Sequence, residues 1–151
     1  NSIVGLMVGD GPLHADCVRY VEDRKVPVRF TGFLNQTQIV TSYVAADALV
    51  LPSDGGETWG VVVNEAMTCG LPCLVSSEVG CGPDLIASHD TGAVFPLGDI
   101  GALADHLKAL ASDRALLSRL GRNAQEKSST FSVHASAKSI VEAVKVCLGH
   151  A

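Results

Sequence analysis

Short apolar segments alternate with amphipathic segments along most of the chain. Five apolar runs, each followed by glycine, proline or a polar turn, predict strands at 3–8, 26–31, 48–51, 72–75 and 92–96. The run at 3–8 contains no polar side chain, so we expect a buried strand there.

Between and after these runs, apolar residues recur at the three- and four-residue spacing of helices. This spacing predicts helices over 12–24, 35–44 and 60–69, and a helical turn at 84–86. Pro12 suits the first position of a helix, and Gly70 is placed to end the third one. Other helix starts are marked by capping side chains: Asn35 with Gln38 as a capping box, and then Asp99, Asp113 and Ser132 for three late helices.

This alternation is typical of an α/β protein with a parallel sheet. We therefore expect residues 1–151 to form a single domain, a Rossmann-like doubly wound parallel sheet in a three-layer α/β/α sandwich. Ligands of such sheets bind at the carboxyl ends of the strands. The loops at 9–12, 32–35, 53–60 and 76–83 are the candidates for a binding site.

Composition narrows the classes of function. The net charge of −5 makes the chain a poor nucleic-acid binder, because phosphate binding needs clustered cations. No apolar run approaches the ~20 residues of a membrane span, and no signal-peptide pattern is visible. Five cysteines, an odd set without zinc-ligand spacing, predict free thiols rather than disulfides or a metal site, and they fit a reducing cytoplasm.

The most informative stretch runs from Ser53 to Gly70. Glu57 lies in its glycine-rich loop, and Glu65 lies eight positions later, inside the predicted helix. Free backbone amides at 58–60, at the helix start, favour an anion such as a diphosphate. Glu65 is then placed to accept both hydroxyls of a ribose, with Glu57 beyond the phosphates. A structural interpretation remains open, because the helix dipole alone favours acidic residues near a helix start.

Residues 57–72, with the sequence ETWGVVVNEAMTCGLP, resemble the E-x7-E segment of retaining glycosyltransferases of the GT-B fold, group 1 (glycosyltransferase family 4). Four more motifs resemble that family in the same order: VGDGP at 8–12, VRFTGF at 28–33, ADALVLPS at 46–53 and the Gly-Asp step at 98–99. Together the motifs cover nearly the whole chain. The resemblance implies one half of a GT-B fold, the carboxy-terminal domain that binds a nucleotide-diphosphate sugar.

The resemblance also implies a role for individual residues. Glu57 would be the catalytic carboxylate, which contacts the transferred sugar and supports the developing oxocarbenium charge. Glu65 would hold the ribose, and Phe33 and Leu34 would line the base pocket. The distal phosphate would be held by backbone amides, those of Thr58, Trp59 and Gly60. The implied activity is that of a retaining hexosyltransferase, with no cofactor and no metal ion.

We expect this sequence to lack two parts of the family's fold. One is the first βα unit, which carries an Arg and a Lys that clamp the diphosphate, and the other is the amino-terminal acceptor-binding domain. The chain alone should therefore bind donor weakly and transfer no sugar. An exposed sheet edge at 3–8, or at the neighbouring strand, predicts a homo-oligomer. A mildly basic helix surface is a solvated face or a peripheral membrane contact of a longer protein: Arg114, Arg119, Arg122 and Lys127.

A second hypothesis is a non-catalytic module that binds a nucleotide sugar or a partner through the same pocket. Glu57 discriminates between the two, because Glu57→Gln in the full-length protein should abolish transfer only if the chain is catalytic. A nicotinamide cofactor is disfavoured, since His14 stands where the third glycine of GxGxxG belongs. Trp59 stands where the family usually has Phe, and we expect it to pack rather than to stack on the donor.

Overall fold

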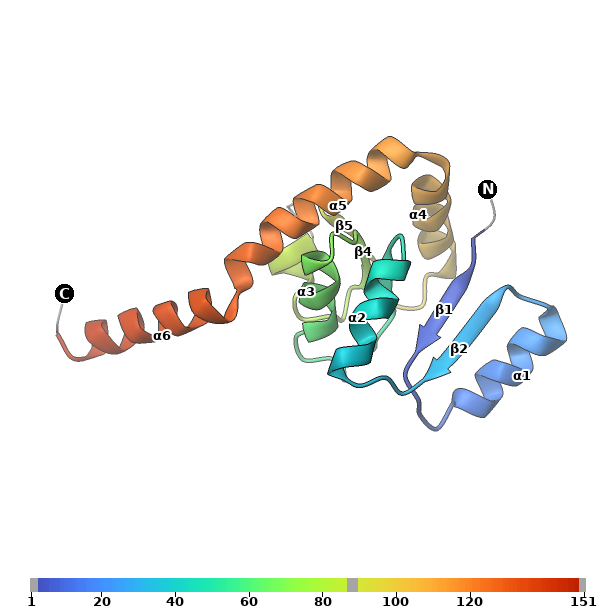
Figure 1. The fold of residues 1–151 in the computed structure, drawn as a ribbon, viewed down its shortest axis with the longest axis horizontal. Helices are drawn as coiled ribbons and strands as arrows, with labels where there is room; N and C mark the ends of the chain where they lie inside the picture. Colours follow the sequence, from blue (N-terminus) through green and yellow to red (C-terminus); the bar gives the residue numbers. More distant parts are fainter. Residues whose placement is uncertain (1–2, 87–89, 150–151) are drawn as a thin grey trace.

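The computed structural model describes residues 3–86 and 90–149, in which strands and helices alternate (Figure 1). The strands are β1 (Gly5–Val8), β2 (Val28–Gly32), β3 (Leu49–Leu51), β4 (Cys73–Ser76) and β5 (Gly92–Phe95). The helices are α1 (His14–Arg24), α2 (Gln36–Ala45), α3 (Val61–Thr68), α4 (Ile100–Ser112), α5 (Arg114–Ser128) and α6 (Val133–Cys147). A π-helical turn, η1 (Gly82–Ile86), and a 3-10 turn, η2 (Ser129–Phe131), complete the fold. The five predicted strands and the predicted turn at 84–86 are confirmed.

The predicted helix caps are confirmed as well. The amide of Gln38 donates to Asn35 Oδ1 at 3.0 Å, and the amide of Asn35 donates to Gln38 Oε1 at 3.2 Å. This reciprocal pair satisfies two of the amides that a helix start leaves without a partner. The three late helices begin after side chains that accept an amide hydrogen bond: Asp99, Asp113 and Ser132.

The strands are parallel, as predicted, but they pair in two separate groups. β1 pairs with β2, and β3, β4 and β5 pair in that order. Among the described residues no pairing joins β1 to β3. Each of these two strands therefore keeps one edge without a sheet partner in the described part of the chain.

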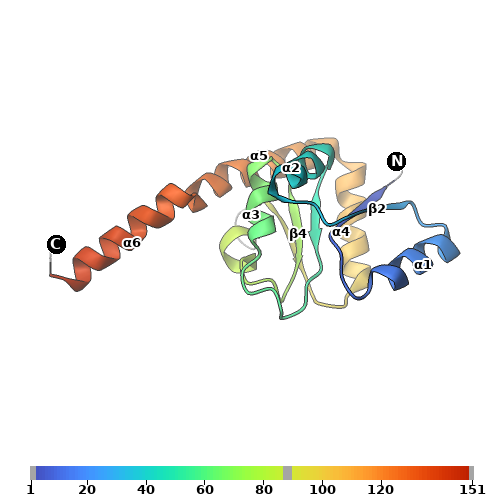
Figure 2. The same cartoon turned by 60° about the horizontal axis from the view of Figure 1, so that its bottom comes forward.

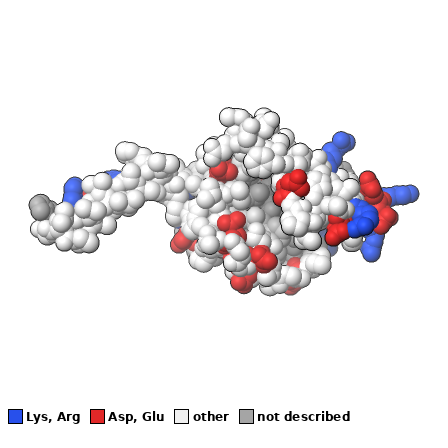
Figure 3. Space-filling model, turned by 90° about the horizontal axis from the view of Figure 1, so that it is seen from below, with Lys and Arg blue, Asp and Glu red and all other residues white. Residues whose placement is uncertain are grey.

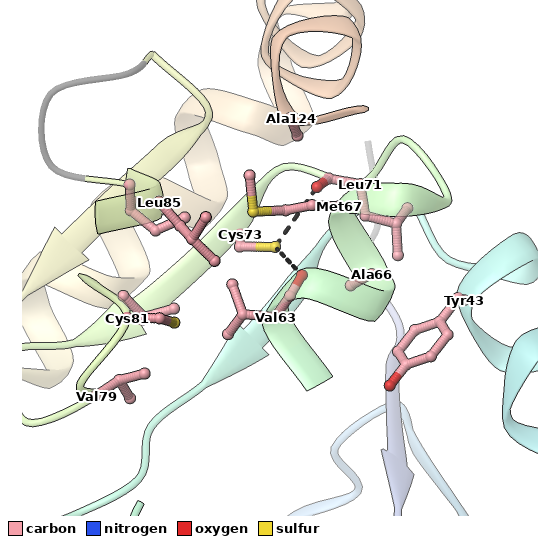
Figure 4. Close-up of a cluster of buried hydrophobic side chains, with 12 residues drawn as sticks. Tyr43, Val63, Ala66, Met67, Leu71, Cys73, Val79, Cys81, Leu85 and Ala124 are labelled. Atoms are coloured by element: carbon pink, nitrogen blue, oxygen red, sulfur yellow. Dashed lines mark hydrogen bonds between the residues drawn. The ribbon is translucent and has the colours of Figure 1, made fainter. Parts of the chain in front are cut away.

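Helices cover both faces of the β3–β4–β5 group, which confirms the three-layer arrangement (Figures 1 and 2). Successive strand residues point to opposite faces, so β4 contributes to two cores. Cys73 and Val75 pack on one face with residues of α3 and η1, including Val63, Met67 and Leu85 (Figure 4). Leu74 packs on the other face, with Phe95, Leu110 and Leu120.

The β1–α1–β2 unit is much more open. It contains no buried residue, and Leu6 and Met7 of β1 are 44% and 46% exposed. The expectation of a buried strand at 3–8 is therefore wrong, because neither hydrophobic core cluster of the described residues reaches β1. Helix α1 begins at His14 rather than at Pro12, since the amide of His14 donates to the carbonyl of Gly11 and closes a turn first.

Helix α6 extends away from the rest of the molecule (Figures 1 and 2). It has no buried residue, and apolar side chains such as Val133 and Ile140 are exposed along it. Within residues 3–86 and 90–149, no helix combines the length and the apolar character that crossing a membrane requires.

Candidate functional site

The loop that joins β3 to α3 crosses the carboxyl end of the sheet and starts the candidate site. Gly60 caps α3 with φ +100°, a left-handed backbone that side chains rarely allow. A Cβ on Gly60 would also lie 3.1 Å from Val79 Cγ1 and 3.2 Å from Cys81 Sγ. The start of α3 thus requires a glycine on both conformational and steric grounds.

The loop after β4 packs closely against the loop before α3. The amide of Cys81 donates to the carbonyl of Trp59 at 2.7 Å. A Cβ on Gly80 would lie only 2.1 Å from the carbonyl oxygen of Thr58, so this contact excludes any side chain at Gly80. These two contacts fix the backbone that leads into the helix.

This backbone presents amides with no partner in the described part of the chain. The amide of Val63 donates to the carbonyl of Gly60 at 2.9 Å, which is the first bond of the helix. No hydrogen bond between described residues uses the amides of Thr58, Trp59 or Gly60. Together with the positive end of the helix dipole, these donors can bind an anion.

The two glutamates of the predicted site lie on different sides of this helix start. Glu57 is half-buried in the loop near Cys81, and burial of that thiol, with a smaller contribution from the charge of Glu57, raises the pKa of Cys81 to about 11. Glu65 is half-buried in α3 on the side of α2, where its Oε2 accepts a hydrogen bond from the Tyr43 hydroxyl at 2.8 Å. The amides at 58–60 lie between them in the chain.

Tyr43 is the polar partner of Glu65, and the sequence pattern did not reveal it. The helical spacing from Ile39 and Val40 places Tyr43 in the apolar stripe of α2, and among the described residues of that helix it is the buried one. Burial, and then its hydrogen bond to Glu65, raise the pKa of the Tyr43 hydroxyl well above its usual value. The general rule that a buried tyrosine hydroxyl finds an acceptor was the available signal, but it does not name the acceptor.

The other predicted residues take different positions. The Trp59 ring is half-buried against the core, with its centroid 6.0 Å from that of Phe131, so it packs as expected. Phe33 and Leu34 follow β2, and the Phe33 ring is 77% exposed. Residues 57–60 lead directly into α3 and Glu65 lies inside that helix, whereas Phe33 and Leu34 lie in a separate loop that follows β2.

The loops at the carboxyl ends of the strands carry acidic residues and no lysine or arginine. The acidic residues of these loops follow β1, β3, β4 and β5: Asp10, Asp54, Glu57, Glu78 and Asp99. Figure 3 shows acidic side chains spread over this side of the molecule, with basic side chains gathered toward α1 and along α6. Positive potential for an anion must therefore come from the backbone in this part of the chain.

The predicted basic surface of α5 is largely engaged within the chain. Arg114 Nη1 lies 2.8 Å from Asp47 Oδ1, and Arg119 pairs with Asp90. Lys127 Nζ lies 5.2 Å from the centre of the Phe131 ring. These contacts favour the solvated-face interpretation over a membrane contact, because three of the four cations already have partners.

Two cavities lie at the opposite end of the strands. One of about 410 Å³ is bordered by Asp47, Leu71, Gly121 and Arg122, and one of about 420 Å³ by Val4, Pro27, Val28 and Arg29. Neither touches the start of α3. Within the described residues, no three His, Cys, Asp or Glu side chains gather as a metal site would require.

Comparison with known proteins matches this chain to one family. The family model described as "Glycosyl transferases group 1" matches residues 1–127. The sulfoquinovosyl transferase of Arabidopsis thaliana is 34% identical over 127 residues, which cover 82% of this chain and 24% of that protein. The N-acetyl-alpha-D-glucosaminyl L-malate synthase of Bacillus anthracis is 34% identical over 121 residues, which cover 80% of this chain and 31% of that protein.

Solved structures share the fold. Sucrose-phosphate synthase from Thermosynechococcus elongatus aligns with a TM-score of 0.81 at 27% identity, over 97% of this chain and 39% of that one. Anabaena HepE, solved in complex with UDP, aligns with a TM-score of 0.81 at 24% identity, over 95% of this chain and 41% of that one. The chain thus spans well under half the length of these relatives and neighbours.

Proposed function

The chain belongs to the group 1 glycosyltransferases, and on that premise we propose that it is the domain that binds a nucleotide-diphosphate sugar for retaining glycosyl transfer. The observation that carries the proposal is the start of α3. There the backbone amides of residues 58–60 donate no hydrogen bond to any described residue, and Glu57 and Glu65 lie before and after them in the chain. The relatives named above transfer or join sugars, and Anabaena HepE, one of the two structural neighbours named above, was solved with UDP.

Each part of the donor has a matching group at this site. The distal phosphate fits the amides of Thr58, Trp59 and Gly60, because they are donors at the positive end of a helix dipole. The ribose fits Glu65, since a carboxylate accepts hydrogen bonds from two adjacent hydroxyls. Phe33 and Leu34, at the end of β2, are the proposed base contacts.

Glu57 is the proposed catalytic residue. As the bond between the sugar and the phosphate lengthens, the sugar ring gains oxocarbenium character, and a nearby carboxylate stabilises that charge. The departing phosphate takes the proton of the acceptor hydroxyl, whose oxygen forms its bond to the anomeric carbon on the same face, and the configuration at that carbon is retained. The amides at 58–60 stabilise the charge that develops on the leaving phosphate, and this scheme requires no metal ion and no cofactor.

The proposal places the other half of the activity outside this chain. We propose that residues 1–151 form the donor half of a cytoplasmic two-domain hexosyltransferase and that the acceptor binds to a second domain. The chain covers 24% and 31% of the first two relatives, which supports a longer whole protein. The isolated chain should accordingly show donor binding without turnover.

The test separates binding from catalysis. UDP, GDP and ADP are titrated calorimetrically into the full-length protein and into its Glu65→Gln and Glu57→Gln variants, and sugar transfer is measured in parallel. We expect Glu65→Gln to weaken binding, and Glu57→Gln to abolish transfer while binding of the diphosphate persists. Unchanged transfer in Glu57→Gln would favour the alternative, a non-catalytic nucleotide-sugar module. Absence of binding to all three nucleotides would refute both.

A further inference from the structure

The hydrogen bond between Tyr43 and Glu65 joins two helices at the edge of the site. Tyr43 comes from α2 and Glu65 from α3, and the Tyr43 hydroxyl donates to Glu65 Oε2 at 2.8 Å. Figure 4 shows the Tyr43 ring beside α3, with its hydroxyl at the end of the ring that points away from α2. From this geometry we propose that Tyr43 is a positioning residue, which holds the Glu65 carboxylate in the orientation that receives the ribose of the donor. The inference rests on the proposed function, and it adds a residue to that same site.

The Tyr43 ring itself is held firmly. It is 7% exposed and belongs to the core cluster that includes Val63, Ala66 and Met67. A ring packed in this way has one position available for its hydroxyl, so the hydrogen bond imposes that position on Glu65. The remaining carboxylate oxygen, Oε1, is engaged in no hydrogen bond with the described residues.

This arrangement suits a diol better than a mobile glutamate would. A free Glu side chain has many rotamers, and immobilising it costs free energy whenever a ligand binds. Tyr43 immobilises Glu65 before the ligand arrives. The loss of side-chain entropy therefore occurs when the protein folds and does not weaken ligand binding. Oε2 of Glu65 accepts from the Tyr43 hydroxyl with one lone pair and can accept from one ribose hydroxyl with its second lone pair. Oε1 can then accept from the other ribose hydroxyl.

The protonation of Tyr43 is consistent with this role. Burial and the contact with Glu65 raise the pKa of the Tyr43 hydroxyl above its usual value. The hydroxyl therefore remains protonated, and so remains a hydrogen-bond donor, throughout the neutral range. The ribose hydroxyls meet a group that only accepts.

The experiment compares ribose with 2′-deoxyribose. Among UDP, GDP and ADP, the tightest binder and its 2′-deoxy counterpart are titrated into the full-length protein and into three variants: Tyr43→Phe, Glu65→Gln and the double variant. We expect the preference for ribose to fall about tenfold in Tyr43→Phe, since a hydrogen bond to a charged group has been removed. The preference should be lost in Glu65→Gln, with no further loss in the double variant.

Tyr20→Phe is the matched control. Tyr20 is the other tyrosine of the sequence, 57% exposed on α1, and it undergoes the same chemical change away from the site. It should leave the ribose preference unchanged. In transfer assays, Tyr43→Phe should raise KM for the donor more than it lowers kcat, because the reacting sugar does not touch Tyr43.

The outcomes are distinguishable. If Tyr43→Phe keeps the wild-type preference for ribose while Glu65→Gln loses it, Tyr43 is a packing residue and the inference is overturned, although the proposed function stands. If the wild-type protein binds none of the nucleotides, or shows no preference for ribose, the proposed placement of the donor fails as well. The ratio of two affinities is insensitive to the folded fraction, so partial unfolding of a variant does not obscure the result.

Discussion

The two strand groups of the molecule contrast in how they are packed. Every residue of β4 is buried, between a core on the α3 side and a core on the α4 and α5 side. The β1–α1–β2 unit has the same strand–helix–strand order and an equally apolar first strand, yet it contains no buried residue. Apolar composition alone therefore does not bury a strand. Burial depends on what lies against both faces, and only the β3–β4–β5 group has helices over both of its faces.

The largest expected effect on stability comes from truncating a leucine side chain to alanine in each of the two strand groups. Leu74 is 1% exposed in β4 and Leu6 is 44% exposed in β1. Leu74→Ala should lower the free energy of unfolding by about 2–5 kcal/mol, because it leaves a cavity between packed layers. Leu6→Ala should cost less than about 1 kcal/mol, since little apolar area leaves the protein interior. Urea unfolding of both variants measures the difference, and equal losses would contradict the contrast.

The next effect concerns the glycine that starts α3. Gly60→Ala should cost about 1–3 kcal/mol, because it places a side chain in a left-handed backbone that is also crowded by Val79 and Cys81. Gly98→Ala is the matched control, with φ +81° and no atom within 4 Å of the added Cβ. Thermal unfolding should show the larger loss for Gly60→Ala, and only that variant should weaken nucleotide binding. A larger loss at Gly98 would mean that backbone strain, not crowding, dominates.

The open strand group also predicts self-association. An unpaired strand edge invites pairing with another chain, and an added charge on such a strand opposes it. Met7→Lys in β1 should weaken association of the 151-residue chain about tenfold, which corresponds to ~1.4 kcal/mol. Val44→Lys, at an exposed position of α2, is the control. Sedimentation over a range of concentrations gives the association constants, and a wild-type chain that stays monomeric throughout would exclude the edge as an interface.

The smallest effect is a dependence of stability on alkaline pH that arises in the packed group. The thiol of Cys81 has its pKa raised from 9.0 to about 11, chiefly by burial. Folding favours the neutral thiol of Cys81 over the thiolate. The stability that this thiol contributes is therefore complete below about pH 9 and is lost as the pH rises toward 11. Cys81→Ala should flatten the fall in unfolding free energy over this window. Cys147→Ala, at an exposed position, should leave the fall unchanged.

Local features were predictable from the sequence because neighbouring residues determine them. The Asn35–Gln38 capping box and the end of α3 at a glycine each depend on a few consecutive residues, and the structure contains both, with Gly70 at φ +80° just after α3. The exposure of β1 and the pairing of Tyr43 with Glu65 depend on residues far apart in the chain. A carboxylate among the apolar residues of α3 needs a partner, and only the packing of α2 against α3 identifies Tyr43 as that partner.

The acidic loops at the carboxyl ends of the strands have a consequence for the response to ionic strength. A ligand bearing phosphates is usually released as salt is added, because mobile ions compete with lysine and arginine. Here the fixed charges in those loops are carboxylates, and in the proposed complex the attraction comes from uncharged amides. Added salt should then screen repulsion and tighten the complex formed by the 151-residue chain. The opposite slope in the full-length protein would reveal that its counter-charge is supplied from beyond these residues.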